Sequence, residues 1–306
     1  MKFTKMHGLG NDYIYVDAAR EAAPEPAALA RAISDRHTGV GADGLILMFP
    51  SERADVRMEM YNADGSRGRM CGNGLRCVAK YAIEHGWAAG PEVLVETDAG
   101  LCRAWCELSR GRVERVRADM GRPALEPRAL PAELSCDRVV NHPLELCGQI
   151  VAITCVSMGN PHAVVFVEDL AGVDLPRLGP ALAGHPLFPD GVNAHFVRVH
   201  DRHRVAMVTW ERGSGPTRAC GTGACAVCVA GVVTARTERR IRASLPGGEL
   251  DVEWNTDQHV YMSGPAVEVF EGHWPVSDAI RGSGAASSTS AVPGVRTADP
   301  VPLKGP

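Results

Sequence analysis

Along the chain, short apolar runs alternate with a few longer stretches that carry a helical pattern. The short runs are rich in β-branched and aromatic residues and are bounded by Gly, Pro, Asn or Asp, which predicts strands. These runs span 2–6, 13–17, 45–49, 56–61, 93–97, 101–108, 113–120, 163–167, 194–199 and 205–210. Helices are predicted over 27–36, 73–85, 175–184 and 222–236.

The helix predicted over 222–236 differs from the others because it has no charged face. It carries no charged residue before Arg236, and its run from Ala224 to Ala230 is apolar on every side. A helix that is apolar all round must be buried all round. Because the rest of the chain is rich in strands, we expect a sheet wrapped about a central helix.

Several motifs recur at a constant separation of 149 residues. The corresponding pairs are Gly10-Asn11 with Gly159-Asn160, 45–48 with 194–197, Tyr61 with Trp210, and Cys71 with Cys220. Both cysteines stand in a Cys-Gly-polar-Gly segment that leads into a predicted helix. A constant shift across four separate motifs predicts a duplicated domain.

Composition narrows the class of protein. The chain has 306 residues, 45% of them hydrophobic, which is enough for two globular domains. A net charge of −4 and a single short basic run at 239–242 argue against a nucleic-acid partner. No apolar run approaches the ~20 residues that cross a membrane. Ten cysteines without a secretory signal are typical of a reducing, cytoplasmic compartment. The aromatic-free segment 278–306 is expected to be disordered.

The paired cysteines are the strongest candidates for chemistry. A cysteine at a helix N-terminus meets free backbone N–H groups and the positive end of the helix dipole, which stabilise a thiolate. The same N–H groups form a site for a carboxylate, and the flanking glycines let a ligand approach the backbone. Two structural cysteines in tight turns are the alternative, and their equivalent positions in a repeat argue against it.

Other motifs favour ordinary structural roles. Cys225 and Cys228 have redox-motif spacing, but they lie inside the apolar run, so we expect core packing. The glycine-rich segment 39–44 follows a helical stretch and precedes a strand, the reverse of the dinucleotide-binding order, and Asp43-Gly44 is predicted as a turn. The eleven histidines show no metal-ligand spacing. We therefore expect no metal and no nucleotide.

Two polar groups near the repeated motifs allow two interpretations. His162 lies on a tight turn after Asn160-Pro161, where a buried structural role is the commoner one, but its place in the repeat favours function. Glu211-Arg212 ends a predicted strand. It is either a solvated pair or a site for a zwitterionic amino acid.

Taken in order, these motifs resemble those of the diaminopimelate epimerase family. The matching segments are 6–12, 61–66, 71–74, 158–162, 211–213, 219–224 and 264–267. The resemblance extends over roughly residues 1–275. One departure is Gly44, because many family members carry Gln at this position.

The resemblance implies an α+β fold of two pseudo-repeated domains. Each would be a curled, barrel-like, mixed or antiparallel sheet around a central helix, with the active site in the cleft between them. We expect the domains to span 1–117, completed by a returning strand at 264–277, and 118–263. The family acts as a homodimer without a cofactor, and it interconverts LL- and meso-diaminopimelate for lysine and cell-wall synthesis.

The resemblance also implies roles for individual residues. Cys71 and Cys220 would be the acid/base thiols, tuned by His162 and Glu211. The substrate would be held by Asn11, Asn62, Gly72, Asn73, Asn160, Asn193, Glu211, Arg212, Gly221 and Thr222. These roles suit the chemistry, since inversion through a carbanion needs a base on one face and an acid on the other.

Three alternatives stay open on the sequence. A sister racemase acting on proline or hydroxyproline would share the fold and both thiols. Its substrates lack the second amino-acid head that Glu211-Arg212, Asn62 and Asn193 would suit. A thiol–disulfide protein using Cys71 and Cys220 is the second alternative, and a non-catalytic binding module is the third.

Overall fold

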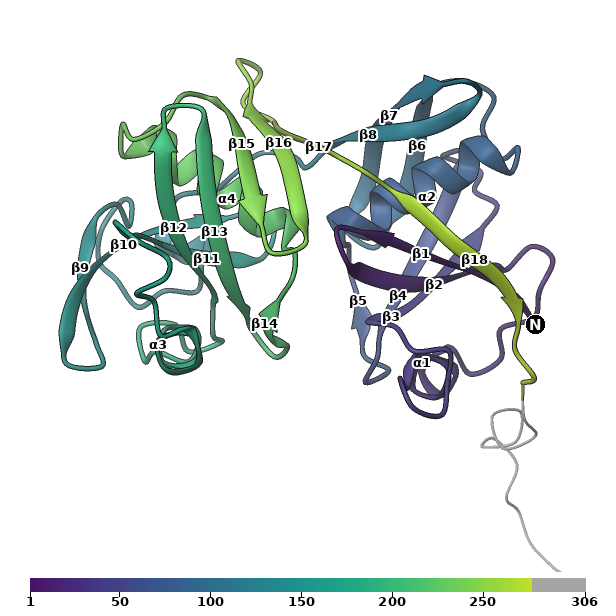
Figure 1. Cartoon of the computed structure of the whole chain (residues 1–306), viewed down its shortest axis with the longest axis horizontal. Coiled ribbons are helices and arrows are strands. Elements are labelled where there is room, and N and C mark those ends of the chain that lie inside the picture. The colour runs from purple at the N-terminus through teal and green to yellow at the C-terminus, as the bar shows by residue number, and fades with distance from the viewer. Residues whose placement is uncertain (277–306) are drawn as a thin grey trace, which may run out of the picture.

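The computed structural model describes residues 1–276 and consists of two lobes that lie side by side (Figure 1). The fold is α+β and mostly sheet, as predicted. The N-terminal lobe contains β1 to β8 and β18, and the C-terminal lobe contains β9 to β17. No helix in residues 1–276 has the length and apolar character needed to cross a membrane. The segment 278–306, for which disorder was expected, lies outside the described residues.

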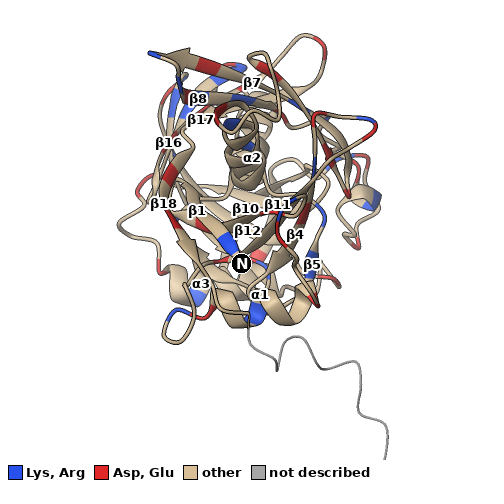
Figure 2. Cartoon of the chain, turned by 90° about the vertical axis from the view of Figure 1, so that its right-hand side faces the viewer, with Lys and Arg blue, Asp and Glu red and all other residues tan. Residues whose placement is uncertain are grey.

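The N-terminal lobe curls its strands around one helix. Its helices are α1 (Pro26–Ser34) and α2 (Gly72–Glu84). Its strands are β1 (Lys2–Gly8), β2 (Asn11–Asp17), β3 (Gly44–Phe49), β4 (Val56–Asn62), β5 (Arg67–Gly68), β6 (Glu92–Thr97), β7 (Gly100–Ser109), β8 (Arg112–Asp119) and β18 (Val267–His273). In Figure 2, α2 lies among these strands, and both signs of charge are mixed over the face shown.

The C-terminal lobe repeats this arrangement around α4 (Gly221–Val233), with α3 (Leu175–Ala183) on its outside. A short 3-10 turn, Pro127–Ala129, lies in the connection between the lobes. The strands are β9 (His142–Leu146), β10 (Gln149–Ser157), β11 (Pro161–Phe166), β12 (Asn193–Asp201), β13 (Arg204–Glu211), β14 (Gly215–Thr217), β15 (Arg240–Leu245), β16 (Gly248–Trp254) and β17 (Val260–Gly264).

The repeat seen in the sequence is also a repeat of strand register. The parallel pair β2 and β3 aligns Tyr13 with Gly44, and the parallel pair β11 and β12 aligns His162 with Asn193, 149 residues later in both cases. The helices α1 and α3, and α2 and α4, correspond residue for residue under the same shift. The antiparallel pairs β3–β4 and β12–β13 also correspond, with Leu45 opposite Tyr61 and Ala194 opposite Trp210, whereas β10–β11 is shifted by one residue relative to β1–β2.

The helix α4 is buried on all sides, as its apolar sequence predicted. Cys225 and Cys228 are fully buried in it and belong to the core. The helix ends at Val233 rather than at the predicted residue 236. The reason is local, because Ala235 adopts a left-handed backbone with φ of 57°, which cannot continue a right-handed helix.

The lobes exchange their last strands. Strand β8 pairs with β17 at the centre of the molecule, with Asp119 opposite Tyr261. Beyond this junction the chain from β8 enters the C-terminal lobe, where β9 pairs with β10. The chain from β17 enters the N-terminal lobe, where β18 pairs with β1 (Figure 1). There Met1 and Trp274 exchange backbone hydrogen bonds of 2.9 and 2.8 Å, so the start of the chain lies beside the end of its described part.

Candidate active site between the lobes

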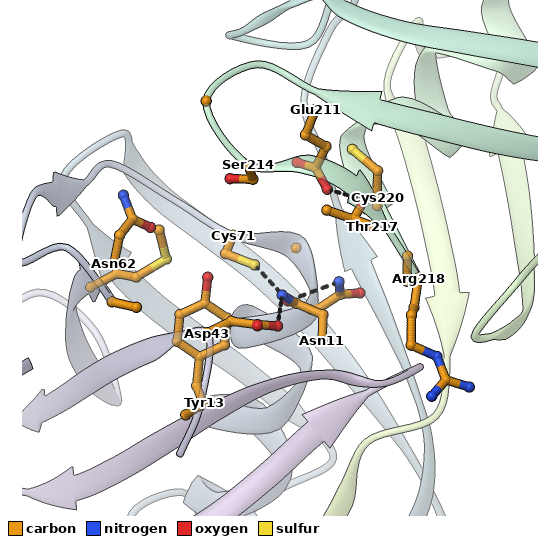
Figure 3. A pocket seen from close by; sticks show the side chains of 18 of the residues that line it. Asn11, Tyr13, Asp43, Asn62, Cys71, Glu211, Ser214, Thr217, Arg218 and Cys220 are labelled. Carbon is orange, nitrogen blue, oxygen red and sulfur yellow. Dashed lines mark hydrogen bonds between the residues drawn. The ribbon is translucent and has the colours of Figure 1, made fainter. Parts of the chain in front are cut away.

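A cleft of about 920 Å³ lies between the two lobes, and both contribute to its walls (Figure 3). From the N-terminal lobe it receives Asn11, Tyr13, Asp43, Asn62, Cys71, Gly72 and Asn73 among others. From the C-terminal lobe it receives Asn160, Glu211, Arg212, Thr217, Arg218, Cys220, Gly221 and Thr222 among others. Most of the residues singled out in the sequence are thus brought to one place, although they come from six separate segments, at 11, 62, 71–73, 160, 211–212 and 220–222.

Each of the two cysteines forms the N-cap of a central helix. Cys71 precedes α2 in an extended conformation, and its Sγ accepts a hydrogen bond from the backbone N–H of Gly74 at 3.5 Å. Cys220 precedes α4 in the same conformation. The prediction that both thiols lie at helix N-termini is confirmed, and the thiols face the cleft from opposite lobes.

Burial works against ionisation of both thiols. Burial raises the pKa of Cys71, while the N–H groups of Gly74 and Asn73 act to lower it. Burial and the carboxylate of Glu211 raise the pKa of Cys220 well above its usual value. The sequence predicted thiolate stabilisation by the helix ends, and that effect is present, but desolvation is larger.

On the N-terminal wall, Asn11 connects Cys71 to a carboxylate. Its Nδ2 donates to Oδ2 of Asp43 at 2.8 Å, and its Oδ1 accepts from Nδ2 of Asn73 at 3.1 Å. Sγ of Cys71 also donates to this Oδ1, at 3.6 Å. Asp43 therefore fixes which end of the Asn11 amide faces the thiol.

The predicted turn at Asp43-Gly44 is wrong. Gly44 is the first residue of β3 and pairs with Tyr13 and Asn62, while Asp43 precedes the strand and faces the cleft. A Cβ at Gly44 would collide with the carbonyl oxygen of Tyr61 and with the Tyr13 ring. The backbone here therefore leaves no room for a side chain at position 44.

On the C-terminal wall, Glu211 is held by Thr217. The hydroxyl of Thr217 donates to Oε1 of Glu211 at 2.6 Å (Figure 3). Burial raises the pKa of Glu211. The neighbouring Arg212 lines the cleft with its guanidinium turned to the carbonyl of Asp190, 2.8 Å away. A carboxyl and a guanidinium thus border the same space.

Two residues predicted for the site lie behind its wall. Asn193 does not line the cleft. Its Nδ2 donates to the carbonyl of Pro161 at 3.0 Å, and its Oδ1 accepts from the N–H of Arg212 at 3.0 Å. His162 is fully buried, and its Nε2 lies 2.9 Å from Oδ1 of Asn160. Both are placed to orient residues that do line the cleft.

A second buried histidine continues this arrangement. Nδ1 of His162 lies 2.9 Å from Nε2 of His195, whose Nδ1 lies 2.9 Å from the hydroxyl of Thr209. Burial lowers the pKa of His195 to about 3 and the pKa of His162 well below its usual value. His162, His195 and Cys220 are close enough together to suggest a metal site. Every ring nitrogen already has a hydrogen-bond partner, so we interpret the group as a hydrogen-bonded chain.

Sequence reasoning missed Tyr13, Asp43, His195, Thr209 and Arg218. Each contributes to the cleft or its support through strand pairing or a loop, and no motif surrounds His195 or Thr209. Under the 149-residue shift Tyr13 is equivalent to His162, and Ile46 is equivalent to His195. A position-by-position comparison of the two copies could therefore have drawn attention to Tyr13 and His195. Asn62 was predicted and lies on the N-terminal rim, where its Nδ2 donates to Ser66 Oγ at 2.9 Å.

The sequence matches the family model of diaminopimelate epimerase over residues 3–126 and 154–269. Curated relatives of that name share about half of their residues with this chain. The protein of Desulforudis audaxviator is 52% identical over 276 residues, covering 90% of this chain and 99% of the relative. The protein of Moorella thermoacetica is 50% identical over 278 residues, covering 90% of this chain and all of the relative (100%).

Solved structures of more distant proteins share the fold. A probable proline racemase from Agrobacterium radiobacter K84 superposes with a TM-score of 0.68 at 17% identity, covering 90% of this chain and 93% of that chain. A hydroxyproline epimerase from Agrobacterium vitis superposes with a TM-score of 0.65 at 18% identity, covering 89% and 91%. At these identities the similarity concerns the fold alone.

Proposed function

The chain belongs to the diaminopimelate epimerase family and is an isomerase acting on diaminopimelate, and we propose that Cys71 and Cys220 are its paired acid and base. One observation carries the proposal. The two cysteines cap equivalent helices of a duplicated fold and face one cleft from opposite walls. This is the arrangement that inversion of a stereocentre requires.

In the proposed reaction, one cysteine reacts as thiolate and the other as thiol. The thiolate removes the proton from the α-carbon, and the electron pair left on that carbon is delocalised into the carboxylate. The thiol then delivers its proton to the opposite face, which leaves the charges of the two sulfurs exchanged. The reverse reaction uses the same groups in reversed roles, so no cofactor is needed for the proton balance.

The two helix N-termini would bind the reacting carboxylate. Gly72 and Asn73 begin α2, and Gly221 and Thr222 begin α4, so free backbone N–H groups of both helices point to the cleft. The charge that develops on the carboxylate in the transition state meets these fixed dipoles. Packing against the core accounts for the glycines at the two helix starts, because a Cβ at Gly72 would collide with the buried Met262 and one at Gly221 would lie 3.1 Å from its sulfur.

The other end of diaminopimelate is a second amino-acid group, and the cleft offers partners for it. Glu211 and Arg212 present a carboxyl and a guanidinium, with Asn62 and Asn160 as polar neighbours. We propose that Asn193 and His162 act from behind the wall by holding Arg212 and Asn160. A proline-type substrate has no group to satisfy this end of the cleft.

The test is incubation of the protein with LL-diaminopimelate in deuterated water. The wild type is expected to form the meso isomer and to incorporate deuterium at the α-carbon. Cys71→Ala and Cys220→Ala should each lower turnover by orders of magnitude, since each removes the group for one face. Cys225→Ala is the matched control in a cysteine buried in the core. Near-normal turnover in both single variants would refute the two-thiol mechanism.

We further propose that the domains span 1–117 with 264–277, and 118–263, and that the protein is a cytoplasmic homodimer serving lysine and peptidoglycan synthesis. Support for the dimer comes from β18. Within the described residues β18 pairs only with β1, and its Val267, Val269 and Phe270 are 40%, 52% and 44% exposed. An apolar edge strand of this kind favours association. Light scattering would show a monomer if this were wrong.

A further inference from the structure

The asparagines Asn11 and Asn160 are equivalent in the repeat, and each lies between a thiol and a buried support. In the N-terminal lobe the support is a chain of hydrogen bonds from Arg76 to Asp43. The guanidinium of Arg76 donates to Oδ1 of Asn73 at 2.8 Å, Nδ2 of Asn73 donates to Oδ1 of Asn11 at 3.1 Å, and Nδ2 of Asn11 donates to Asp43 at 2.8 Å.

The direction of this first chain is fixed by its two ends. A guanidinium can only donate hydrogen bonds, and a carboxylate can only accept them. Both amides between Arg76 and Asp43 must therefore point the same way. The group that Asn11 presents to Cys71 is consequently its carbonyl oxygen, an acceptor, with which Sγ makes its 3.6 Å contact.

In the C-terminal lobe a different chain supports Asn160. It runs from the hydroxyl of Thr209 through the rings of His195 and His162 to Oδ1 of Asn160, with 2.9 Å at each step. From Asn160, Nδ2 donates to the hydroxyl of Thr222 at 3.4 Å, and that hydroxyl lies 3.8 Å from Sγ of Cys220.

Two neutral imidazoles could carry this chain in either direction, and Thr209 decides between them. Thr209 is 3% exposed, and in residues 1–276 its hydroxyl has His195 as its only hydrogen-bond partner. If His195 donated to it, the hydroxyl hydrogen would be buried without an acceptor, which is costly. The hydroxyl therefore donates to Nδ1 of His195.

Each remaining step follows from that first one. A neutral imidazole that accepts at Nδ1 carries its hydrogen on Nε2. His195 then donates from Nε2 to Nδ1 of His162, and His162 donates from Nε2 to Oδ1 of Asn160. The amide of Asn160 thus turns its NH2 group toward Thr222, whose hydroxyl is left free to donate to the sulfur of Cys220.

We propose that Thr209 and His195 are positioning residues that orient the Asn160 amide through His162, so that the chain donates toward Cys220 while Asn11 accepts from Cys71. Neither residue lines the cleft. The proposal rests on the function proposed above, because it assigns opposite hydrogen-bonding partners to the two thiols of that mechanism. A donor stabilises negative charge on Cys220, and an acceptor stabilises the proton on Cys71.

The packing around His195 supports a dedicated role. Its ring lies against the first turn of α4, so closely that a Cβ at Gly223 would collide with it. The equivalent position in the N-terminal lobe is Ile46, which packs in the same way on Gly74 at the first turn of α2. An apolar side chain therefore satisfies the packing at this position, and the histidine adds the hydrogen bonds.

The electrostatic surroundings are consistent with neutral rings. Burial keeps the pKa of both imidazoles low, so that each offers one donor and one acceptor. Around Cys220, the facing ionisable groups are Glu211 on β13, Cys71 at the start of α2, and His162 and His195 on β11 and β12. The carboxylate of Glu211 opposes ionisation of Cys220, and the hydrogen bond from Thr222 acts against that effect.

The direct test is the tautomer of each ring in the substrate-free, 15N-labelled full chain, measured by long-range 1H–15N NMR between pH 6 and 8. His162 and His195 are expected to carry hydrogen on Nε2 alone. Hydrogen on Nδ1 of either ring would overturn the proposal. This result does not depend on turnover, so it separates this proposal from the two-thiol mechanism, which is tested by the cysteine variants.

The variant test uses Thr209→Val, which keeps the shape of the side chain and removes the hydroxyl. We expect a mixed tautomer at His195 and a loss of about tenfold in kcat, the equivalent of about 1.4 kcal/mol, with a smaller change in KM. Thr209→Ser should restore both. Thr154→Val is the matched control, a buried threonine of the same lobe whose hydroxyl accepts from the N–H of Asn141. Wild-type kcat and tautomers in Thr209→Val would overturn the proposal, and if that variant does not fold, the wild-type tautomers decide.

Discussion

Several residues in the cleft, or directly behind its wall, hold a neighbouring residue in one orientation by a hydrogen bond. Asp43 holds Asn11, Thr217 holds Glu211, and Asn193 holds the backbone of Arg212. Amides and hydroxyls outnumber fixed charges among these contacts. The cleft can therefore present a donor at one point and an acceptor at another through neutral groups, while the carboxylate of Glu211 acts on Cys220 as a charge.

One charged network under the cleft should govern acid stability. Asp12 is buried and contacts Lys5 at 3.0 Å and Arg36 at 2.7 Å. Burial alone would raise the pKa of Asp12, but the hydrogen bonds from Arg36 and Lys5 outweigh it and lower the pKa. A lowered carboxyl pKa stabilises the fold above the unfolded value of about 3.9, and this contribution is lost as the pH falls through the folded value.

We therefore expect Asp12→Asn to lower the free energy of unfolding at pH 7 by about 1–3 kcal/mol, because it leaves Lys5 without its ion-pair partner and Arg36 with Asp43 alone. The variant should also lose less stability than the wild type between pH 5 and pH 3. Urea unfolding at several pH values measures both effects. Asp137→Asn, at an exposed carboxyl, is the control. Parallel pH dependences for Asp12→Asn and wild type would contradict this account.

At the residue scale, the sequence predicted those positions whose signal is local. Cys71 and Cys220 were identifiable because a helix start, two glycines and a repeat all coincide. Asp43 was misassigned as part of a turn, because its partners Asn11 and Arg36 are brought to it only by the pairing of β2 with β3 and by the end of α1. His195 and Thr209 face each other across the β12–β13 pair, and no local motif records that register.

Among the elements, the central helix α4 has little room for added volume at one of its glycines. Gly231 lies in α4, where a Cβ would collide with Oγ1 of the buried Thr237 and lie 3.2 Å from its Cβ. Alanine usually stabilises a helix by up to about 1 kcal/mol relative to glycine. At this position the crowding should outweigh that gain.

We expect Gly231→Ala to lower the free energy of unfolding by about 1–3 kcal/mol. Gly90→Ala is the matched control, since no atom lies within 4 Å of a Cβ at this loop position, and it should stay within about 0.5 kcal/mol of wild type. Thermal unfolding followed by circular dichroism compares the two. A stabilised Gly231→Ala would mean that Thr237 moves away at little cost.

Sequence patterns predicted the long elements well and the short ones poorly. The starts of α2 and α4 follow from their Cys-Gly motifs, and the burial of α4 follows from its composition. Helix ends depend on single backbone angles, as Ala235 demonstrates. The strands β5, β9 and β14 were not predicted, because runs of two to five residues carry too little periodicity. The strands β15, β16 and β17, of five to seven residues, were not predicted either.

At the scale of the whole molecule, the cleft lies between two lobes whose thiols must reach one carbon from opposite sides. Without substrate, closure of the lobes should therefore allow the two sulfurs to react. We expect a mild oxidant to inactivate the enzyme by a disulfide between Cys71 and Cys220, a reductant to restore it, and substrate to protect it. Peptide mapping under non-reducing conditions identifies the bond. A disulfide between Cys225 and Cys228 would show that the wrong pair had been chosen.

The lobes also depend on each other through β18. A chain that ends after Val276 should keep its activity and melting temperature, because the deleted composition offers little apolar surface. A chain that ends after Gly264 also loses β18, which pairs along β1 and covers Phe3 with Phe270. We expect that second truncation to lose several degrees of melting temperature or to be insoluble, and equal melting temperatures for the two would contradict this.

The exchange of last strands has a consequence for synthesis. A ribosome makes the N-terminal lobe before the C-terminal lobe, yet the strand that completes the N-terminal lobe is the last strand of residues 1–276. Every strand of the C-terminal lobe is translated before β18 can reach β1. The edge of β1 that pairs with β18 therefore stays unpaired until the C-terminal lobe has been synthesised. The lobe that is synthesised first is thus completed last.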